Sequence, residues 1–219
     1  MAEPTATALR GPGATGGGPA AEPHPQDVVS RHFNALDQRP AHLSDLDVAL
    51  LSPYYRALLT ADGTVRLIEA HVLEPVHAHR THQNRTVLPA GPRHHWLDCE
   101  PGTPVVARGV DLVGARTRRR FARAESLLVP ARLPARLAER IDRAPAGIGG
   151  ALDAAHVEHH RELLWNGKEP DGVPMRTYRM MIEGRPAMLI SEWFMVAPWR
   201  AAPAGTADEA LGGPQRGGR

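Results

Sequence analysis

Residues 104–113, Pro-Val-Val-Ala-Arg-Gly-Val-Asp-Leu-Val, decide how this sequence folds. The run predicts a strand, in which side chains two residues apart share a face. Val106, Arg108, Val110 and Leu112 therefore point the same way. A single arginine on an apolar face needs an anion, because an unpaired buried charge is costly. The guanidinium group fits a carboxylate with two parallel hydrogen bonds, so we expect Arg108 to bind one, from the protein or from a ligand.

The rest of the chain extends this pattern to an antiparallel sheet. Short connections at 114–118 and 183–186 force the strands on either side to be antiparallel neighbours. The further predicted strands are 76–84, 119–129, 175–183 and 187–197. Predicted helices begin at Ser52-Pro53 and at Thr64, include Leu133, Leu137 and Ile141, and run from Asp153 to Gly167. The order predicts an α+β fold, with one antiparallel sheet and helices packed on one face.

Composition limits the class of protein. The 219 residues include 26 basic and 24 acidic side chains, a formal net charge of +2, and no basic run with interleaved aromatics, so we expect no nucleic-acid partner. The single cysteine, Cys99, excludes an internal disulfide and favours a reducing, cytoplasmic compartment. No apolar run is long enough to span a bilayer, and the first residues do not form a signal peptide.

The domain organisation follows from the same composition. Residues 1–25 and 201–219 are rich in Gly, Pro and Ala, and we expect both to be disordered tails. Residues 26–200 should then form one folded domain.

A second unexpected charge lies in the apolar strand 187–196. Glu192 shares its face with Met188, Ile190 and Phe194, so it either has a charged partner or a raised pKa. Two interpretations remain open. Arg108 and Glu192 form a structural ion pair, or Arg108 holds a ligand carboxylate in a closed pocket while Glu192 contacts the opposite end of that ligand. The small residues of 145–150, ahead of a helix, favour the pocket.

These features occur with a series of short motifs in a fixed order. They are Ala-Asp-Gly-Thr-Val-Arg-Leu-Ile-Glu-Ala (61–70), Val-Ala-Arg-Gly-Val-Asp-Leu (106–112), Ala-Glu-Ser-Leu-Leu-Val-Pro (124–130), Arg-Leu-Pro (132–134), Gly-Ile-Gly (147–149), His-Val-Glu-His-His-Arg-Glu-Leu (156–163), Arg-Thr-Tyr-Arg (176–179) and Gly-Arg-Pro-Ala-Met-Leu-Ile-Ser-Glu-Trp-Phe (184–194). Over about residues 50–200 the chain resembles the chorismate pyruvate-lyase family, and in particular its actinobacterial branch, which makes 4-hydroxybenzoate.

The resemblance implies a single antiparallel sheet with helical flaps over a buried ligand. It implies a carbon–oxygen lyase of secondary metabolism that cleaves chorismate to 4-hydroxybenzoate and pyruvate without metal or organic cofactor. The carboxylate-binding arginine of the family falls on Arg108 and its essential glutamate on Glu192. Its backbone-amide contact falls on Ile148, next to Gly149. Where the family has Lys or Arg followed by a polar residue near the ligand, this chain has His82-Gln83.

Two other functions are compatible with the same residues. The fold also serves as the effector-binding domain of bacterial transcription regulators, which bind a small ligand without converting it. The second is a lyase-like biosynthetic enzyme that acts on a relative of chorismate. We expect a small-molecule substrate, chorismate, and no metal, although His156 and His160 have a spacing found in metal sites on helices. The oligomeric state is not determined by these residues, and a monomer is compatible with them.

Overall fold

The computed structural model describes residues 25–135, 137, 141 and 147–195, and the two predicted tails lie outside this range apart from Pro25. Its centre is a six-stranded sheet in the order β1-β2-β3-β6-β5-β4, in which every neighbouring pair is antiparallel. The strands are β1 (Val76–Val87), β2 (Pro104–Gly114), β3 (Arg120–Leu128), β4 (His159–Lys168), β5 (Pro174–Ile182) and β6 (Arg185–Phe194). The predicted α+β class with a single antiparallel sheet is confirmed.

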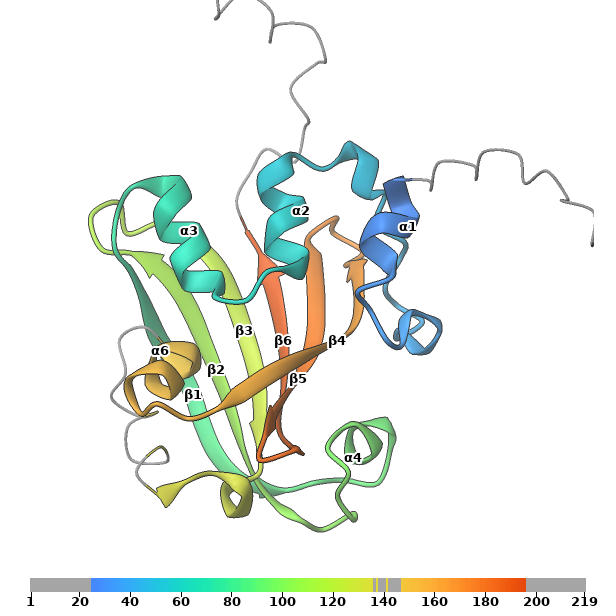
Figure 1. The fold of residues 1–219 in the computed structure, drawn as a ribbon, viewed down its shortest axis with the longest axis vertical. Coiled ribbons are helices and arrows are strands. Elements are labelled where there is room, and N and C mark those ends of the chain that lie inside the picture. The colour runs from blue at the N-terminus through green and yellow to red at the C-terminus, as the bar shows by residue number, and fades with distance from the viewer. Residues whose placement is uncertain (1–24, 136, 138–140, 142–146, 196–219) are drawn as a thin grey trace, which may run out of the picture.

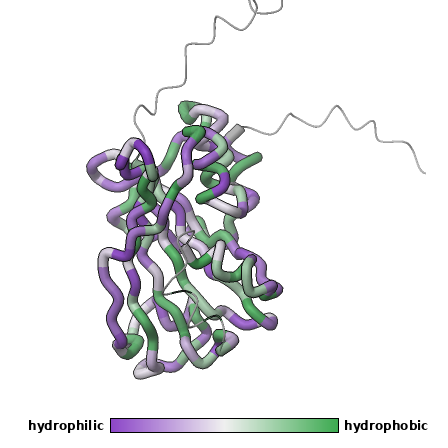
Figure 2. The backbone as a smooth tube through the Cα atoms, turned by 90° about the vertical axis from the view of Figure 1, so that its left-hand side faces the viewer, coloured by the Kyte–Doolittle hydropathy of each residue, from purple (hydrophilic) through white to green (hydrophobic). Residues whose placement is uncertain are grey.

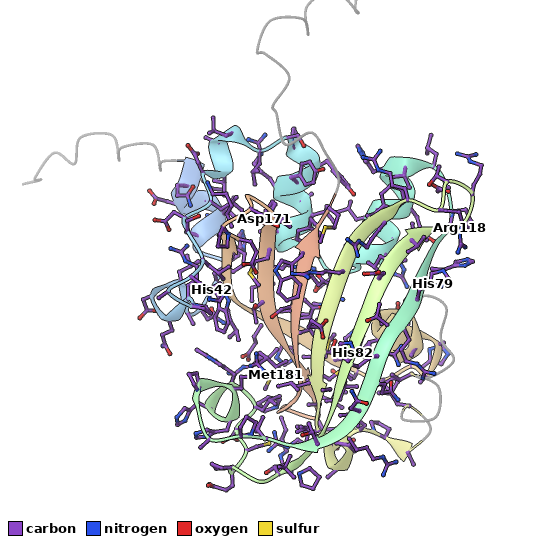
Figure 3. The ribbon with its side chains drawn as sticks, turned by 180° about the vertical axis from the view of Figure 1, so that it is seen from behind. His42, His79, His82, Arg118, Asp171 and Met181 are labelled. Atoms are coloured by element: carbon purple, nitrogen blue, oxygen red, sulfur yellow. The ribbon has the colours of Figure 1, made fainter. Side chains whose placement is uncertain are left out.

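Short helices cover the sheet. They are α1 (Pro25–Ser30), α2 (Pro53–Thr60), α3 (Thr64–Val72), α4 (Pro92–Trp96) and α6 (Gly147–Ala154), with 3-10 turns η1 (Leu36–Gln38), η2 (Val48–Leu50) and η3 (Pro130–Arg132). Helices α2, α3 and α6 lie over one face of the sheet, in front of the strands in Figure 1 and behind them in Figure 3. The larger apolar cluster fills the space beneath them. A smaller cluster, including Leu97 and Leu189, packs on the opposite face.

Local sequence signals explain the α2–α3 hairpin. The predicted start of α2 is confirmed, and the predicted cap of α3 is wrong. The Ser52 side chain accepts a hydrogen bond from the Tyr55 amide and Pro53 occupies the first turn of α2, as predicted. Thr64, however, does not cap α3. Gly63 takes that position in the left-handed conformation, with φ of 79°, and Thr64 is the first helical residue. The buried Thr64 hydroxyl is thereby left to bond within the protein interior.

The predicted helix from Asp153 to Gly167 is wrong. Helix α6 ends at Ala154, and residues 159–168 form β4, which pairs with β5 along its whole length. The prediction rested on the helical spacing of Ala154, Val157, Arg161 and Leu164. Pairing with β5 decides for the strand. In Figure 1, β4 crosses in front of the other strands toward α6. Its first residues therefore face the sheet from the helical side.

Burial alternates along β3, as expected of a strand with a core on one face. Strands β5 and β6 are buried along almost all of their length, because apolar clusters pack on both faces of this part of the sheet. Hydrophobic and hydrophilic segments are interspersed along the chain in Figure 2. Strand β3 of the β2–β3 hairpin pairs with β6 of the β5–β6 hairpin, and this pairing brings the buried residues of the two hairpins together.

Within the described residues, no helix has the length and apolarity to cross a membrane.

Candidate functional site

The site is a cavity of about 630 Å³ between the helix-covered face of the sheet and the elements above it. Its floor includes Val110 and Leu112 of β2, Ala124 and Ser126 of β3, and Tyr178, Ile190 and Glu192 of β5 and β6. Its cover is formed by the start of α3, the start of α6 and the first residues of β4. A ligand in this space is enclosed between the sheet and three separate segments of chain.

Glu192 lies on the floor and accepts hydrogen bonds from three side chains. Its Oε2 accepts a bond from Arg176 Nε at 2.9 Å, and its Oε1 accepts one from the Tyr178 hydroxyl at 3.1 Å. The Thr64 hydroxyl lies 3.0 Å from both carboxylate oxygens. The same Thr64 oxygen accepts from Arg176 Nη2 at 2.8 Å, while Arg176 Nη1 donates to the Ala61 carbonyl at 2.9 Å. All four side chains are buried, so the network is rigid.

The network keeps Glu192 ionised. Burial by itself raises the pKa of this carboxyl group, but the positive charges of Arg176 and Arg161 and the hydrogen bonds from Arg176 and Thr64 outweigh it and lower the pKa. Burial raises the pKa of the neighbouring Tyr178 hydroxyl, which therefore stays protonated and donates. At neutral pH the floor presents a carboxylate held by donors, which makes Glu192 a hydrogen-bond acceptor rather than a proton donor.

The cation that pairs with Glu192 is Arg176, so a structural ion pair between Arg108 and Glu192 is wrong. Sequence analysis missed Arg176, although a usable signal was present. Arg176 shares a strand face with Tyr178 and Met180, and a lone charge among large apolar side chains is the same anomaly that singled out Arg108. Cross-strand register places Arg176 directly opposite Glu192, and register is set by the whole sheet.

Arg108 is buried on the same face of the sheet, at the edge of this cavity. Its strand neighbour Val110 and its cross-strand partner Ser126 both line the cavity. Its side chain is only slightly accessible, and its Nη1 donates to Gln83 Oε1 at 2.8 Å. The structure thus brings Arg108 and Gln83 together, on adjacent strands.

His82 lies on the opposite face of the sheet. Its Nε2 is 3.2 Å from Glu125 Oε2, and 42% of its side chain is exposed. Figure 3 shows it on the side of the strands that is turned away from the helices. A register shift between Arg80 and His82 is the cause, because one extra residue in a strand reverses the face of all that follow. Of the predicted pair, only Gln83 is directed toward Arg108.

Ile148 and Gly149 both line the cavity from the first turn of α6. Gly147, which precedes them, has φ of 69°, a conformation that favours glycine and aims the helix start toward the sheet. An added Cβ on this glycine would meet the Ala78 side chain at 3.4 Å. The residues predicted to make the backbone contact therefore lie at the cavity, where α6 packs closely on β1.

Arg161 is a cavity residue that sequence analysis did not identify. It projects from β4, and its guanidinium carbon lies 4.8 Å from the centre of the Tyr178 ring. Its Nε is 3.6 Å from Asp62 Oδ1, and only 9% of its side chain is exposed. The helix wrongly predicted for this segment gave no reason to place it over the sheet. Only the strand assignment turns Arg161 toward Glu192.

The described residues contain no group of three or more His, Cys, Asp or Glu side chains that would hold a metal ion. His156 and His160 are not on one helix. His156 lies between α6 and β4, and His160 is on β4 beside Glu162.

The chain is similar in sequence to known proteins. No protein-family model matches the chain. The chorismate pyruvate-lyase of Mycobacterium tuberculosis (strain ATCC 25618 / H37Rv) is 27% identical to it over 180 residues, which cover 74% of this chain and 89% of that protein. The Mycobacterium bovis protein of the same name matches to the same extent. The chain is a relative of the chorismate pyruvate-lyases. The resemblance drawn from the motifs is confirmed.

The solved structures that resemble this chain are less similar to it in sequence. The ligand-binding domain of a putative GntR-family transcriptional regulator from Bordetella bronchiseptica is 14% identical, with a TM-score of 0.43 over 58% of this chain and 89% of that domain. PhnF from Mycobacterium smegmatis is 12% identical, with a TM-score of 0.45 over 62% of this chain and 64% of that protein. Likenesses of this size carry no statement about function.

Proposed function

We propose that this protein is a chorismate pyruvate-lyase that converts chorismate to 4-hydroxybenzoate and pyruvate without a cofactor. Its relationship to proteins of that name supports the reaction class. The cavity supports a buried small ligand, because it is covered by α3, α6 and β4 and lined on its floor by apolar residues.

The observation that carries the proposal is the charge of the cavity. Three arginines, 108, 161 and 176, lie on or beside it with little or no exposure. Among the described residues that line it, Glu192 is the only buried carboxylate. The other acids of the lining are more accessible: Glu69 is partly exposed, the side chain of Asp62 is 83% exposed and that of Asp153 is 45% exposed. Arg176 is paired with Glu192, whereas Arg161 Nη1 has no hydrogen-bond partner among the described residues, and a buried cation of this kind favours an anionic ligand.

The spacing of the two predicted site residues suits a hydroxybenzoate ring. Arg108 pairs with Ser126, Ser126 with Ile190, and Glu192 is two residues beyond Ile190 on the same face. Two strand spacings across and two residues along place their backbones about 12 Å apart. A para-hydroxybenzoate with one hydrogen bond at each end spans a similar length. We assign the ring carboxylate to Arg108, the hydroxyl end to Glu192, and an additional amide contact to Ile148 and Gly149.

The reaction requires few chemical steps to be carried out by protein groups. The ether carbon–oxygen bond of chorismate breaks, and its electron pair leaves with the enolpyruvate oxygen. The ring loses a proton from the hydroxyl-bearing carbon and becomes aromatic, and the methylene carbon of enolpyruvate gains a proton to give pyruvate. An enclosed site contributes by excluding water and holding the substrate in the reactive geometry. The ionised Glu192 accepts a hydrogen bond from the substrate hydroxyl and so orients the ring.

Incubation with chorismate tests the proposal. Pyruvate is measured with lactate dehydrogenase and 4-hydroxybenzoate by chromatography, and we expect the two in equal amounts, with no need for added metal and no inhibition by EDTA. Tight binding of 4-hydroxybenzoate without any pyruvate release would contradict the lyase and support an effector-binding domain. Absence of both binding and turnover would indicate a different ligand.

A further inference from the structure

Arg161 is a buried cation at the cavity, and the assignments made so far give it no particular group of the ligand. We propose that Arg161 binds a second carboxylate of the ligand, so that the site is specific for dicarboxylates. For the proposed function, on which this inference rests, that group is the carboxylate of the enolpyruvyl side chain. Arg108 and Arg161 then hold the two ends of a dianion from opposite sides of the cavity.

The placement of Arg161 supports a ligand contact. It is carried by β4, which crosses in front of the sheet in Figure 1, whereas Arg108 is carried by β2 in the sheet itself. The side chain is more than nine-tenths buried, and its Nη1 has no hydrogen-bond partner among the residues that the structure describes. A buried guanidinium nitrogen without an acceptor is costly, and a ligand carboxylate in the adjoining cavity would supply one.

Arg161 interacts electrostatically with Glu192, Asp62 and Asp153, but no described residue accepts a hydrogen bond from its Nη1. Its ion pair is with Asp62, whose side chain is 83% exposed, and exposed pairs contribute little. Glu192 is already bonded to Arg176, Thr64 and Tyr178. The Tyr178 ring beneath the guanidinium orients it by a cation–π contact and accepts no hydrogen bond from Nη1. The balance differs from that of Arg176, whose three nitrogens all have partners.

The start of α6 lies beside the guanidinium and contributes a glycine there. An added Cβ at Gly149 would lie 3.7 Å from Arg161 Nη2, so the first turn of α6 and this side chain meet at one part of the cavity wall. Gly149 has no side chain to fill that space. A substituent on the ring, directed away from the sheet toward β4 and α6, would reach both.

Calorimetric titration with two unreactive ligands tests the inference independently of turnover. 4-Hydroxybenzoate carries one carboxylate. 3-(Carboxymethoxy)-4-hydroxybenzoate keeps that group and adds a second carboxylate through an ether, at the ring position where chorismate carries its enolpyruvyl group. We expect the wild type to bind the dicarboxylate more tightly. Arg161→Gln should weaken dicarboxylate binding by about 10- to 100-fold, and 4-hydroxybenzoate binding by less than about twofold.

Arg66→Gln is the matched control, because Arg66 also lines the cavity but is 76% exposed and already paired with Asp153. We expect it to change both affinities by less than about twofold, since an exposed charge is screened. An equal loss in Arg66→Gln would show a general effect of charge and overturn the contact. Equal effects of Arg161→Gln on the two ligands would overturn it as well.

If the melting temperature shows that Arg161→Gln is unfolded, Arg161→Lys takes its place in the titrations. Lysine keeps the charge and loses the forked geometry, so a selective loss of dicarboxylate affinity is still expected. These experiments distinguish failure of the proposed lyase function from failure of the proposed Arg161 contact. A wild type that releases no pyruvate from chorismate but shows the selective effect refutes the lyase alone, and turnover with unselective variants refutes the role of Arg161 alone. A wild type that binds neither ligand overturns both.

Discussion

Replacing Glu192 with Gln removes a charge from the centre of the site while keeping the shape of the side chain. The variant leaves Arg176, which is fully buried, beside a neutral group. Removing one partner of a buried ion pair destabilises a protein by about 3–5 kcal/mol. Because the amide oxygen can still accept from Arg176 and the hydroxyls of Thr64 and Tyr178 can reorient, we expect the lower end, about 3 kcal/mol.

A loss of this size leaves the protein folded, since domains are stable by about 5–15 kcal/mol. For a folded unit of this length it lowers the melting temperature by about 6–12 °C. The lost charge-assisted bond to the substrate hydroxyl should also reduce kcat/KM by about 10- to 100-fold. Thermal denaturation and coupled pyruvate release measure the two effects on the same sample.

The pH dependence of the Glu192→Gln effect provides a second measurement. The pKa of Glu192 is lower in the folded protein than in the unfolded chain, so its ionised form stabilises the fold above the unfolded pKa, and that contribution is lost as pH falls through the folded pKa. The stability difference between wild type and Glu192→Gln should therefore be largest near neutral pH and shrink in acid. Denaturant titrations at several pH values measure it.

The control is Glu125→Gln, on the opposite face of the neighbouring strand, where Glu125 is 49% exposed beside His82. We expect a change below about 0.5 kcal/mol in stability, and unchanged activity. Wild-type melting temperature and turnover in Glu192→Gln would refute the reasoning, because they would show that the buried charge contributes to neither stability nor catalysis.

Three further substitutions probe the same architecture. Thr64→Val removes the hydroxyl that bridges Glu192 and Arg176 and should lower stability by about 1–3 kcal/mol in urea denaturation; an unchanged midpoint would contradict the network. Arg108→Gln should raise the KM for chorismate by about 10- to 100-fold in the pyruvate assay, and an unchanged KM would remove Arg108 from the ring-carboxylate role. His82→Ala should alter kcat/KM by less than about twofold, because its side chain lies on the other face of the sheet; a large loss would show that it reaches the ligand.

Alternation along single strands was enough to predict much of this protein. A lone Arg108 and a lone Glu192 among apolar side chains are anomalies visible in any strand, whatever it pairs with. The short connections between strands determined that the sheet is antiparallel. These are local properties, and the structure confirms the strands and the burial of both residues.

The partners of those residues depended on information that a single segment does not contain. Glu192 pairs with Arg176 because the register of β5 and β6 sets them opposite each other. His82 turns away from the cavity because of one irregularity in β1. β4 is a strand because β5 offers it a partner, and only then does Arg161 lie over the sheet. The sequence by itself thus identified Arg108 and Glu192 as buried charges, while the tertiary structure revealed Arg176 and Arg161 and decided which charges meet, because pairing depends on the register of the sheet rather than on neighbours in the chain.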